Sequence, residues 1–101
     1  MNKMKNYVNI ALQVLPKSKT KETYELVDDA IEVIKNSGLK YQVCPFETAI
    51  EGPYDEIMNL VEKVQKVCFE EGADELMVYV KIQNRKNSKV TIEEKMIKYI
   101  E

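Results

Sequence analysis

Apolar and polar residues alternate along two stretches of the chain, residues 7–15 and residues 76–82. Successive side chains of a strand point to opposite faces, so strict alternation is typical of a strand that is buried on one face only. We therefore predict two half-buried strands. Their core faces carry Val8, Ile10, Leu12, Val14, Leu76, Val78, Val80 and Ile82.

Two other segments repeat apolar residues at spacings of three and four, which is typical of amphipathic helices. The first is expected to begin at an N-cap on Thr20 and to end at Gly38, because glycine accepts the left-handed conformation that follows many helices. The second begins at Pro53, a residue favoured at the first helical position, and ends at Gly72. The predicted stripes are Tyr24, Val27, Ile31 and Ile34, and Ile57, Leu60, Val61, Val64, Val67 and Cys68.

Proline residues mark the limits of the remaining strands. Pro16 is expected to end the first strand, since proline cannot donate to a strand ladder. Residues 39–44 and 46–51 are two short strand candidates on either side of Pro45. They form either a tight hairpin or one long strand that bends at an edge.

The resulting order is β-α-β-β-α-β, followed by a C-terminal helix. This helix is opened by a capping box at Thr91–Glu94 and is expected to continue to Glu101. The order is the split βαβ pattern of a ferredoxin-like fold, in the α+β class. A chain of 101 residues and 11.8 kDa has room for one core, so residues 1–101 are expected to form a single domain.

Two helices cover only one face of a four-stranded sheet, so the other face should lie open. From the first and last strands this face would present amides, alanine, methionine and tyrosine, which is too apolar a surface to remain bare. We therefore predict a homo-oligomer that pairs through its sheets. The residues expected on this face are Asn9, Ala11, Gln13, Met77, Tyr79 and Lys81.

Composition excludes several classes of function. The chain has no histidine, and its two cysteines, Cys44 and Cys68, are too few for a zinc site. A net charge of −2 argues against nucleic-acid binding, which needs a basic face. We see no signal peptide and no run approaching the ~20 apolar residues that cross a membrane. We therefore expect a cytoplasmic protein with no nucleic-acid or membrane partner.

The sequence also lacks the arrangements typical of enzymes, since it contains no P-loop, no GxGxxG and no GxSxG. The acidic pairs Asp28-Asp29 and Glu70-Glu71 lie on predicted helices, where adjacent side chains diverge. An acylphosphatase-like enzyme would need an arginine-bearing loop after the first strand, and residues 16–21 (PKSKTK) contain neither arginine nor glycine. We therefore expect no catalytic residue, no metal site and no cofactor.

Several segments at matching offsets make the chain resemble the YkoF-like family of small thiamine-binding proteins, essentially from end to end. The most specific part is T-x-x-E-G after S-G-L-x-Y. The segments that carry the resemblance are Leu15-Pro16, Ser37–Tyr41, Thr48–Gly52, Tyr54–Glu56, Gly72-Ala73, Arg85-Lys86 and Lys95.

The resemblance implies a ferredoxin-like protomer that assembles into dimers and tetramers through its sheets. It also implies that thiamine or its hydroxymethylpyrimidine moiety is bound without being turned over. Of the family's positions, only Thr48 and Glu51, in the T-x-x-E-G segment, are carried over as ligand-binding residues.

The remaining site residues are predicted from the chemistry of thiamine, a cationic thiazolium joined to a flat aminopyrimidine. Such a ligand needs amides for the pyrimidine edge, a carboxylate near the cation and an aromatic wall. Asn9 and Gln13 flank Ala11 on one strand face, and Phe46 and Tyr79 are candidate walls. We expect the pocket near the open face and a subunit boundary.

Structural roles remain open for the same residues. Asn9 and Gln13 could pair across a subunit interface, because buried polar groups need partners. Thr48 could be an ordinary strand residue, and Phe46 and Tyr79 could serve packing alone. Glu51 could belong to the entry of the second helix, and strand parity around Pro45 leaves the faces of Thr48 and Glu51 undecided.

The sequence thus supports two functional hypotheses. The first is a non-catalytic homo-oligomer that binds thiamine or hydroxymethylpyrimidine as a carrier, buffer or sensor. The second is an interaction module that pairs through its sheets and regulates a partner, with a different small effector or none.

Overall fold

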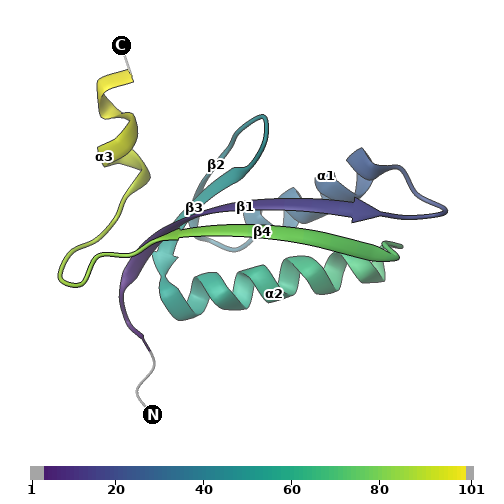
Figure 1. The fold of residues 1–101 in the computed structure, drawn as a ribbon, viewed down its shortest axis with the longest axis horizontal. Helices are drawn as coiled ribbons and strands as arrows, with labels where there is room; N and C mark the ends of the chain where they lie inside the picture. Colours follow the sequence, from purple (N-terminus) through teal and green to yellow (C-terminus); the bar gives the residue numbers. More distant parts are fainter. Residues whose placement is uncertain (1–3, 100–101) are drawn as a thin grey trace.

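Four strands and two long helices follow one another in the predicted order, and a short helical segment comes last among the described residues (Figure 1). The computed structural model describes residues 4–99. The elements are β1 (Tyr7–Lys17), α1 (Thr23–Lys35), β2 (Lys40–Val43), β3 (Thr48–Pro53), α2 (Tyr54–Glu70), β4 (Glu75–Gln83), α3 (Ile92–Met96) and a 3-10 turn, η1 (Ile97–Tyr99).

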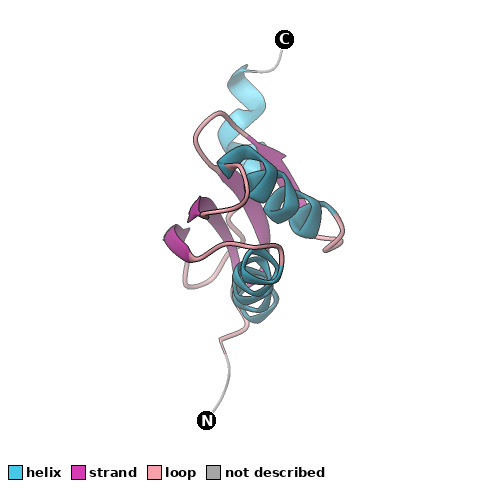
Figure 2. Cartoon of the chain, turned by 90° about the vertical axis from the view of Figure 1, so that its right-hand side faces the viewer, coloured by secondary structure: helices cyan, strands magenta, loops and turns pink. Residues whose placement is uncertain are grey.

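The strands form one antiparallel sheet in the order β2-β3-β1-β4. α1 and α2 pack side by side on one face of it (Figure 2). The core lies between these helices and the alternate residues of the strands, as the alternation predicted. The α+β, ferredoxin-like class is therefore confirmed. The fully buried centre of the core is formed by Val8, Leu26, Ile50, Ile57, Val64 and Cys68.

β1 continues past Pro16, so the prediction that Pro16 ends the strand was wrong. β3 pairs with β1 only as far as the Leu12–Thr48 pair. Beyond it, β1 has β4 alone as a neighbour, and Pro16 lies opposite Leu76. This part of β1 is an edge, where a missing backbone donor is tolerated.

α1 starts later than predicted and buries a neighbouring stripe. Its N-cap is Glu22 rather than Thr20, and no side chain caps it. Tyr24, assigned to the core from its spacing, is 83% exposed. The residues that α1 buries are Leu26, Ala30 and Ile34, which also follow the spacing of four that defines one helix face.

α2 follows the prediction more closely. Of its predicted stripe, all but Val67 are buried. Pro53 ends β3 and serves as the N-cap of α2 rather than as its first helical residue. The helix therefore begins at Tyr54, one residue later than predicted. Gly38 after α1 and Gly72 after α2 have φ angles of 81° and 117°, as expected for glycines that end helices.

The segment around Pro45 forms a hairpin rather than one bent strand. β2 and β3 pair antiparallel, and the backbone N–H of Cys44 donates to the carbonyl of Glu47 at 3.0 Å. β3 begins at Thr48, later than predicted, so Phe46 lies in the hairpin loop. The capping box of α3 is present, and the predicted end of that helix at Glu101 lies outside the described residues.

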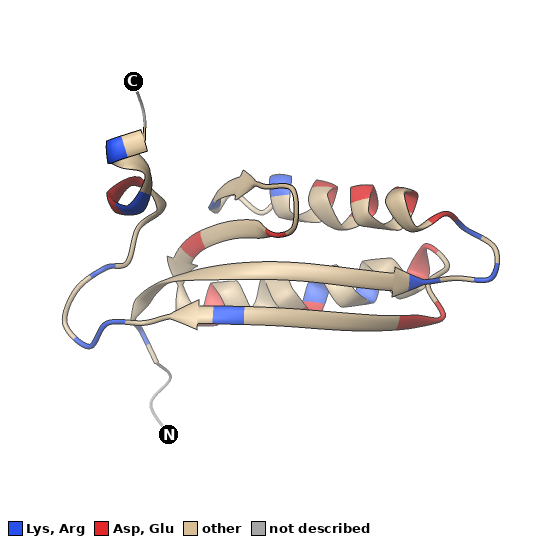
Figure 3. Ribbon diagram, turned by 45° about the horizontal axis from the view of Figure 1, so that its top comes forward, with Lys and Arg blue, Asp and Glu red and all other residues tan. Residues whose placement is uncertain are grey.

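Charged residues avoid most of the sheet (Figure 3). β1 carries only Lys17 near its end, and β4 carries only Glu75 and Lys81. Among residues 4–99, no helix is long and apolar enough to cross a membrane.

Candidate ligand-binding site

The sheet face away from α1 and α2, here called the open face, is organised in rows across β3, β1 and β4. Asn9 pairs with Glu51 on one side and Gln83 on the other. The next row joins Ala49, Ala11 and Lys81. Partners opposite each other on antiparallel strands point to the same face, so these rows define the surface.

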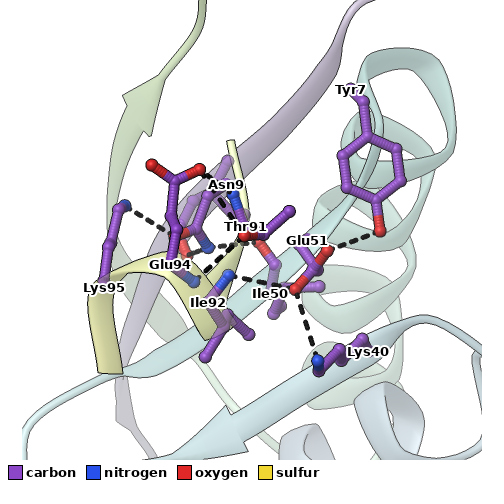
Figure 4. A network of polar contacts seen from close by, with 10 residues as sticks. Tyr7, Asn9, Lys40, Ile50, Glu51, Thr91, Ile92, Glu94 and Lys95 are labelled. Atoms are coloured by element: carbon purple, nitrogen blue, oxygen red, sulfur yellow. Dashed lines mark hydrogen bonds and ion pairs between the residues drawn. The ribbon is translucent and has the colours of Figure 1, made fainter. Parts of the chain in front are cut away.

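Glu51 is the most deeply buried charged residue of this face, only 4% exposed. One carboxylate oxygen accepts a hydrogen bond of 2.6 Å from the Tyr7 hydroxyl. The other accepts one of 3.0 Å from the backbone N–H of Ile92, and Lys40 Nζ lies 4.0 Å from it (Figure 4). Burial and the bond to Glu51 together raise the pKa of Tyr7 to about 12.

Asn9 is buried beside Glu51 and is equally well bonded. Its amide nitrogen donates to the carbonyl of Ile50 at 3.0 Å, and its oxygen accepts a 2.6 Å bond from Lys95 Nζ (Figure 4). Ile92 and Lys95 both belong to α3. These bonds therefore fix α3 over this end of the open face, and we call Tyr7, Asn9, Glu51, Ile92 and Lys95 the C-terminal latch.

The loop before α3 is fixed by a second set of bonds. Thr91 Oγ1 accepts a 3.1 Å bond from the backbone N–H of Glu94, whose carboxylate accepts one from the N–H of Thr91. The same carboxylate pairs with Arg85. The hydrogen bond from Arg85, together with the weaker effect of the backbone N–H of Thr91, lowers the pKa of Glu94 to about 2.

Next to the latch, the open face has a hollow whose floor is the Ala11–Ala49 pair, and we call it the alanine pocket. Two small side chains opposite each other leave space that larger residues would fill. Lys81 Nζ and Glu47 form an ion pair of 3.0 Å at its edge. The pocket consists of two adjoining hollows that share Asn9, Ala49 and Lys95. The other lining residues are Ile10, Ala11, Gln42, Cys44, Glu47, Lys81, Ile82, Gln83, Ile92 and Met96.

Four of the six residues predicted to bind a ligand lie on the open face. Asn9 and Glu51 belong to the latch, so their polar atoms already have partners within the chain. Gln13 and Tyr79 pair with each other one row beyond Ala11. Tyr79 is 51% exposed, as a wall for a ligand or a partner subunit would be.

The other two, Thr48 and Phe46, lie apart from the open face. Thr48 pairs with Leu12, a core residue, and so points toward the helices. Thr48 and Glu51 are an odd number of residues apart in one strand and must face opposite sides. Phe46 lies in the hairpin loop and lines, with Thr48, a separate groove against α1.

Sequence reasoning missed Ala49, Lys81 and Lys95 as parts of the pocket. The parity of β3 was a usable signal for Ala49, because it shares a face with Glu51. Lys81 was placed on the open face without a role. Lys95 lies on α3, which follows the loop after β4 and packs against the open face. The alternating pattern of the strands does not predict where this helix packs.

Metal ligation and thiol chemistry are two further possibilities. Among residues 4–99 there is no cluster of three histidine, cysteine or acidic residues that could hold a metal ion. Both cysteines are free, and burial raises the pKa of the Cys68 thiol, which makes it a poorer nucleophile.

Comparison with known proteins gives a consistent result. Residues 10–100 match the family model described as thiamine-binding protein. A UPF0045 protein of Clostridium perfringens is 43% identical over 91 residues, which are 90% of this chain and 95% of that protein.

Solved structures agree with the sequence match. A domain of unknown function, DUF77, from Bacillus cereus has a TM-score of 0.91 and 40% identity, covering 99% of this chain and 96% of that one. A structure from Thermotoga maritima, described as a candidate thiamine biosynthesis/salvage protein, has a TM-score of 0.83 and 33% identity. The match covers 93% of this chain and 99% of the Thermotoga maritima chain.

Proposed function

This chain belongs to the thiamine-binding protein family, and from that premise we propose that it binds thiamine or its hydroxymethylpyrimidine moiety without converting it. The role is that of a carrier, buffer or sensor, in the cytoplasm. The observation that carries the proposal is the alanine pocket, a hollow on the open face with a small floor, largely apolar walls and a few polar side chains.

The pocket suits the aminopyrimidine half of the ligand. A flat heteroaromatic ring fits over two alanines, and its donor and acceptor edge requires amides close by. Gln42 and Gln83 line the pocket, and Gln13 lies one row away. Tyr79 supplies the aromatic surface beside Gln13.

The proposed ligand residues therefore fall into two groups. Gln13 and Tyr79 are direct contacts, while Asn9 and Glu51 shape the pocket from the latch. Thr48 is only 6% exposed and faces the helices, so it is not retained as a direct contact. Phe46 is 83% exposed in the hairpin loop and is retained only as a residue that a second copy of the chain could bring near the ligand.

We further propose that the active form is a homo-oligomer, a dimer of dimers that pairs through open faces. Support comes from Leu15, Met77 and Tyr79, which are between 42% and 51% exposed at the end of the open face away from α3. Burying such residues against a second sheet removes apolar surface from water. The ligand then lies at a subunit boundary.

Calorimetric titration of the purified chain with thiamine and with hydroxymethylpyrimidine tests the binding. We expect saturable heat with unchanged ligand recovered afterwards. Ala49→Leu should weaken binding by about tenfold or more, because the larger side chain fills the floor. Val43→Leu on the helix-facing side of the same hairpin is the matched control. Absence of binding at high micromolar ligand contradicts the proposal.

A second candidate is a sheet-pairing regulatory module, and the exposed apolar end of the open face favours it. Gln13→Ala distinguishes the two. If this variant changes the mass of the oligomer while no thiamine compound binds to either form, the open face is an interface alone.

A further inference from the structure

The alanine pocket has an unequal distribution of charge. Lys95 from α3 and Lys81 from β4 both line it, and Glu47 is the only acidic residue in its lining. Lys81 is paired with Glu47 at 3.0 Å. Within the described residues, Lys95 has no carboxylate within ion-pair distance.

The contact that Lys95 makes leaves its charge available. Its Nζ donates to Asn9 Oδ1 at 2.6 Å, which is a neutral amide oxygen. An ammonium group has three N–H donors, so the others remain for a ligand. The amide orients the ammonium group and does not neutralise it; the contact is drawn in Figure 4.

Glu51 does not offset this charge for a bound cation. Its side chain is 4% exposed, and both carboxylate oxygens accept hydrogen bonds from Tyr7 and Ile92. Lys40 is a further cation at 4.0 Å from it. A thiazolium in the pocket would therefore meet an ammonium group before it reached an available carboxylate.

We infer that the alanine pocket prefers an aminopyrimidine ligand that carries a phosphomonoester, with Lys95 as the residue that recognises the phosphate. This inference rests on the proposed function and specifies its ligand class. Lysine is a common point-charge partner of phosphate in proteins, and its attraction to a dianion is strong at a partly buried site. Lys81 is the second cation, available when the phosphate competes with Glu47.

Calorimetric titration with four ligands tests the inference: hydroxymethylpyrimidine, its phosphate, thiamine and thiamine monophosphate. Each phosphate should bind about tenfold more tightly than its own alcohol, and the advantage should shrink as salt is raised. Lys95→Gln should remove most of this advantage, measured within the variant as the ratio of its affinities for each phosphate and its own alcohol, so that any loss of affinity common to both ligands cancels. Lys98→Gln, on the adjoining turn, should keep it.

The outcomes separate this inference from the proposed function. If the alcohols bind as tightly as their phosphates, or if Lys95→Gln keeps the advantage, the inference is overturned and the proposed function stands. If none of the four ligands binds, both fail. Lys81→Gln provides a second, independent loss of positive charge, and it should reduce the phosphate advantage less than Lys95→Gln does.

Discussion

The two ends of the open face share one strand, β1, yet they differ in polarity, in burial and in what covers them. At one end Asn9 and Glu51 are polar, buried and covered by α3. At the other end Leu15, Met77 and Tyr79 are apolar and about half exposed. The alanine pocket lies between them.

The difference shows two ways of completing a sheet face that two helices leave uncovered. Buried polar groups require partners with fixed geometry, and the chain supplies these itself through α3. An apolar surface needs only to be removed from water, so a second copy of the chain can cover it. The latch end is thus finished within one protomer, whereas the apolar end is the part of the face that pairs with a second copy in the proposed oligomer.

The largest effect should follow from breaking the latch with Glu51→Ala. This change leaves the Tyr7 hydroxyl and the Ile92 N–H without their acceptor in a buried place, so the free energy of unfolding should fall by about 2–4 kcal/mol. Urea unfolding measures it. Glu47→Ala, which breaks an exposed ion pair four residues before Glu51 in the sequence, should cost less than about 1 kcal/mol. Equal losses of stability in the two variants would contradict the claim that the buried Glu51 carboxylate stabilises the fold more than the exposed Glu47 ion pair does.

The next effect tests the apolar end with Tyr79→Glu. Carboxylates brought together in a paired interface repel, so the association constant should fall by at least about tenfold while the protomer stays folded. Analytical ultracentrifugation measures the change in mass. Tyr24→Glu on α1 is the matched control, since Tyr24 is a more exposed tyrosine on the helical side. Loss of assembly in both variants would point to a different interface.

A smaller effect should appear when Tyr7 titrates. Its pKa is raised to about 12 in the folded chain from an ordinary value of 10.0. The latch bond therefore stabilises the fold fully below pH 10 and loses that contribution as the pH rises toward 12. Ultraviolet titration should show the Tyr7 hydroxyl ionising toward pH 12. In Tyr7→Phe the late step should be missing, and its persistence would assign it elsewhere.

The smallest effect concerns the loop before α3. The pKa of Glu94 is lowered to about 2 from 4.5, mainly by the bond from Arg85. Its contribution is therefore present above pH 4.5 and is lost as the pH falls toward 2. Amide NMR signals of α3 should shift over that range in the wild type. In Glu94→Gln this acid transition should disappear, whereas an unchanged transition would mean that another carboxyl controls α3.

Local patterns were sufficient to predict the strands and the face on which their side chains lie. Alternation placed Asn9, Gln13 and Tyr79 on the open face correctly, because strand parity depends only on neighbouring residues. Phe46 was expected to begin a strand but lies in the hairpin loop, because the loop around Pro45 extends further than the short break predicted. In α1 two apolar stripes overlap, and the packing of Leu26 rather than Tyr24 decided which one was buried.

The latch could not be predicted from the sequence. It joins Asn9 and Glu51 to α3 across more than forty residues of chain, and the path of the loop after β4 determines where α3 lies. Glu51 was expected to face a cationic ligand, whereas the structure shows it bonded to Tyr7 and Ile92. A carboxylate's partner depends on tertiary contacts that no periodic pattern records.

The central claim is that the ligand binds over the Ala11–Ala49 floor of the alanine pocket. Its most direct test uses the four alanines of the chain as reporters. Ala11 and Ala49 form the pocket floor, while Ala30 and Ala73 are buried in the core on the helical side. In methyl-labelled protein titrated with hydroxymethylpyrimidine, its phosphate or thiamine, the account predicts that the signals of Ala11 and Ala49 shift and those of Ala30 and Ala73 stay. Shifts confined to Ala30 and Ala73, or a ligand that binds without moving Ala11 and Ala49, would contradict it.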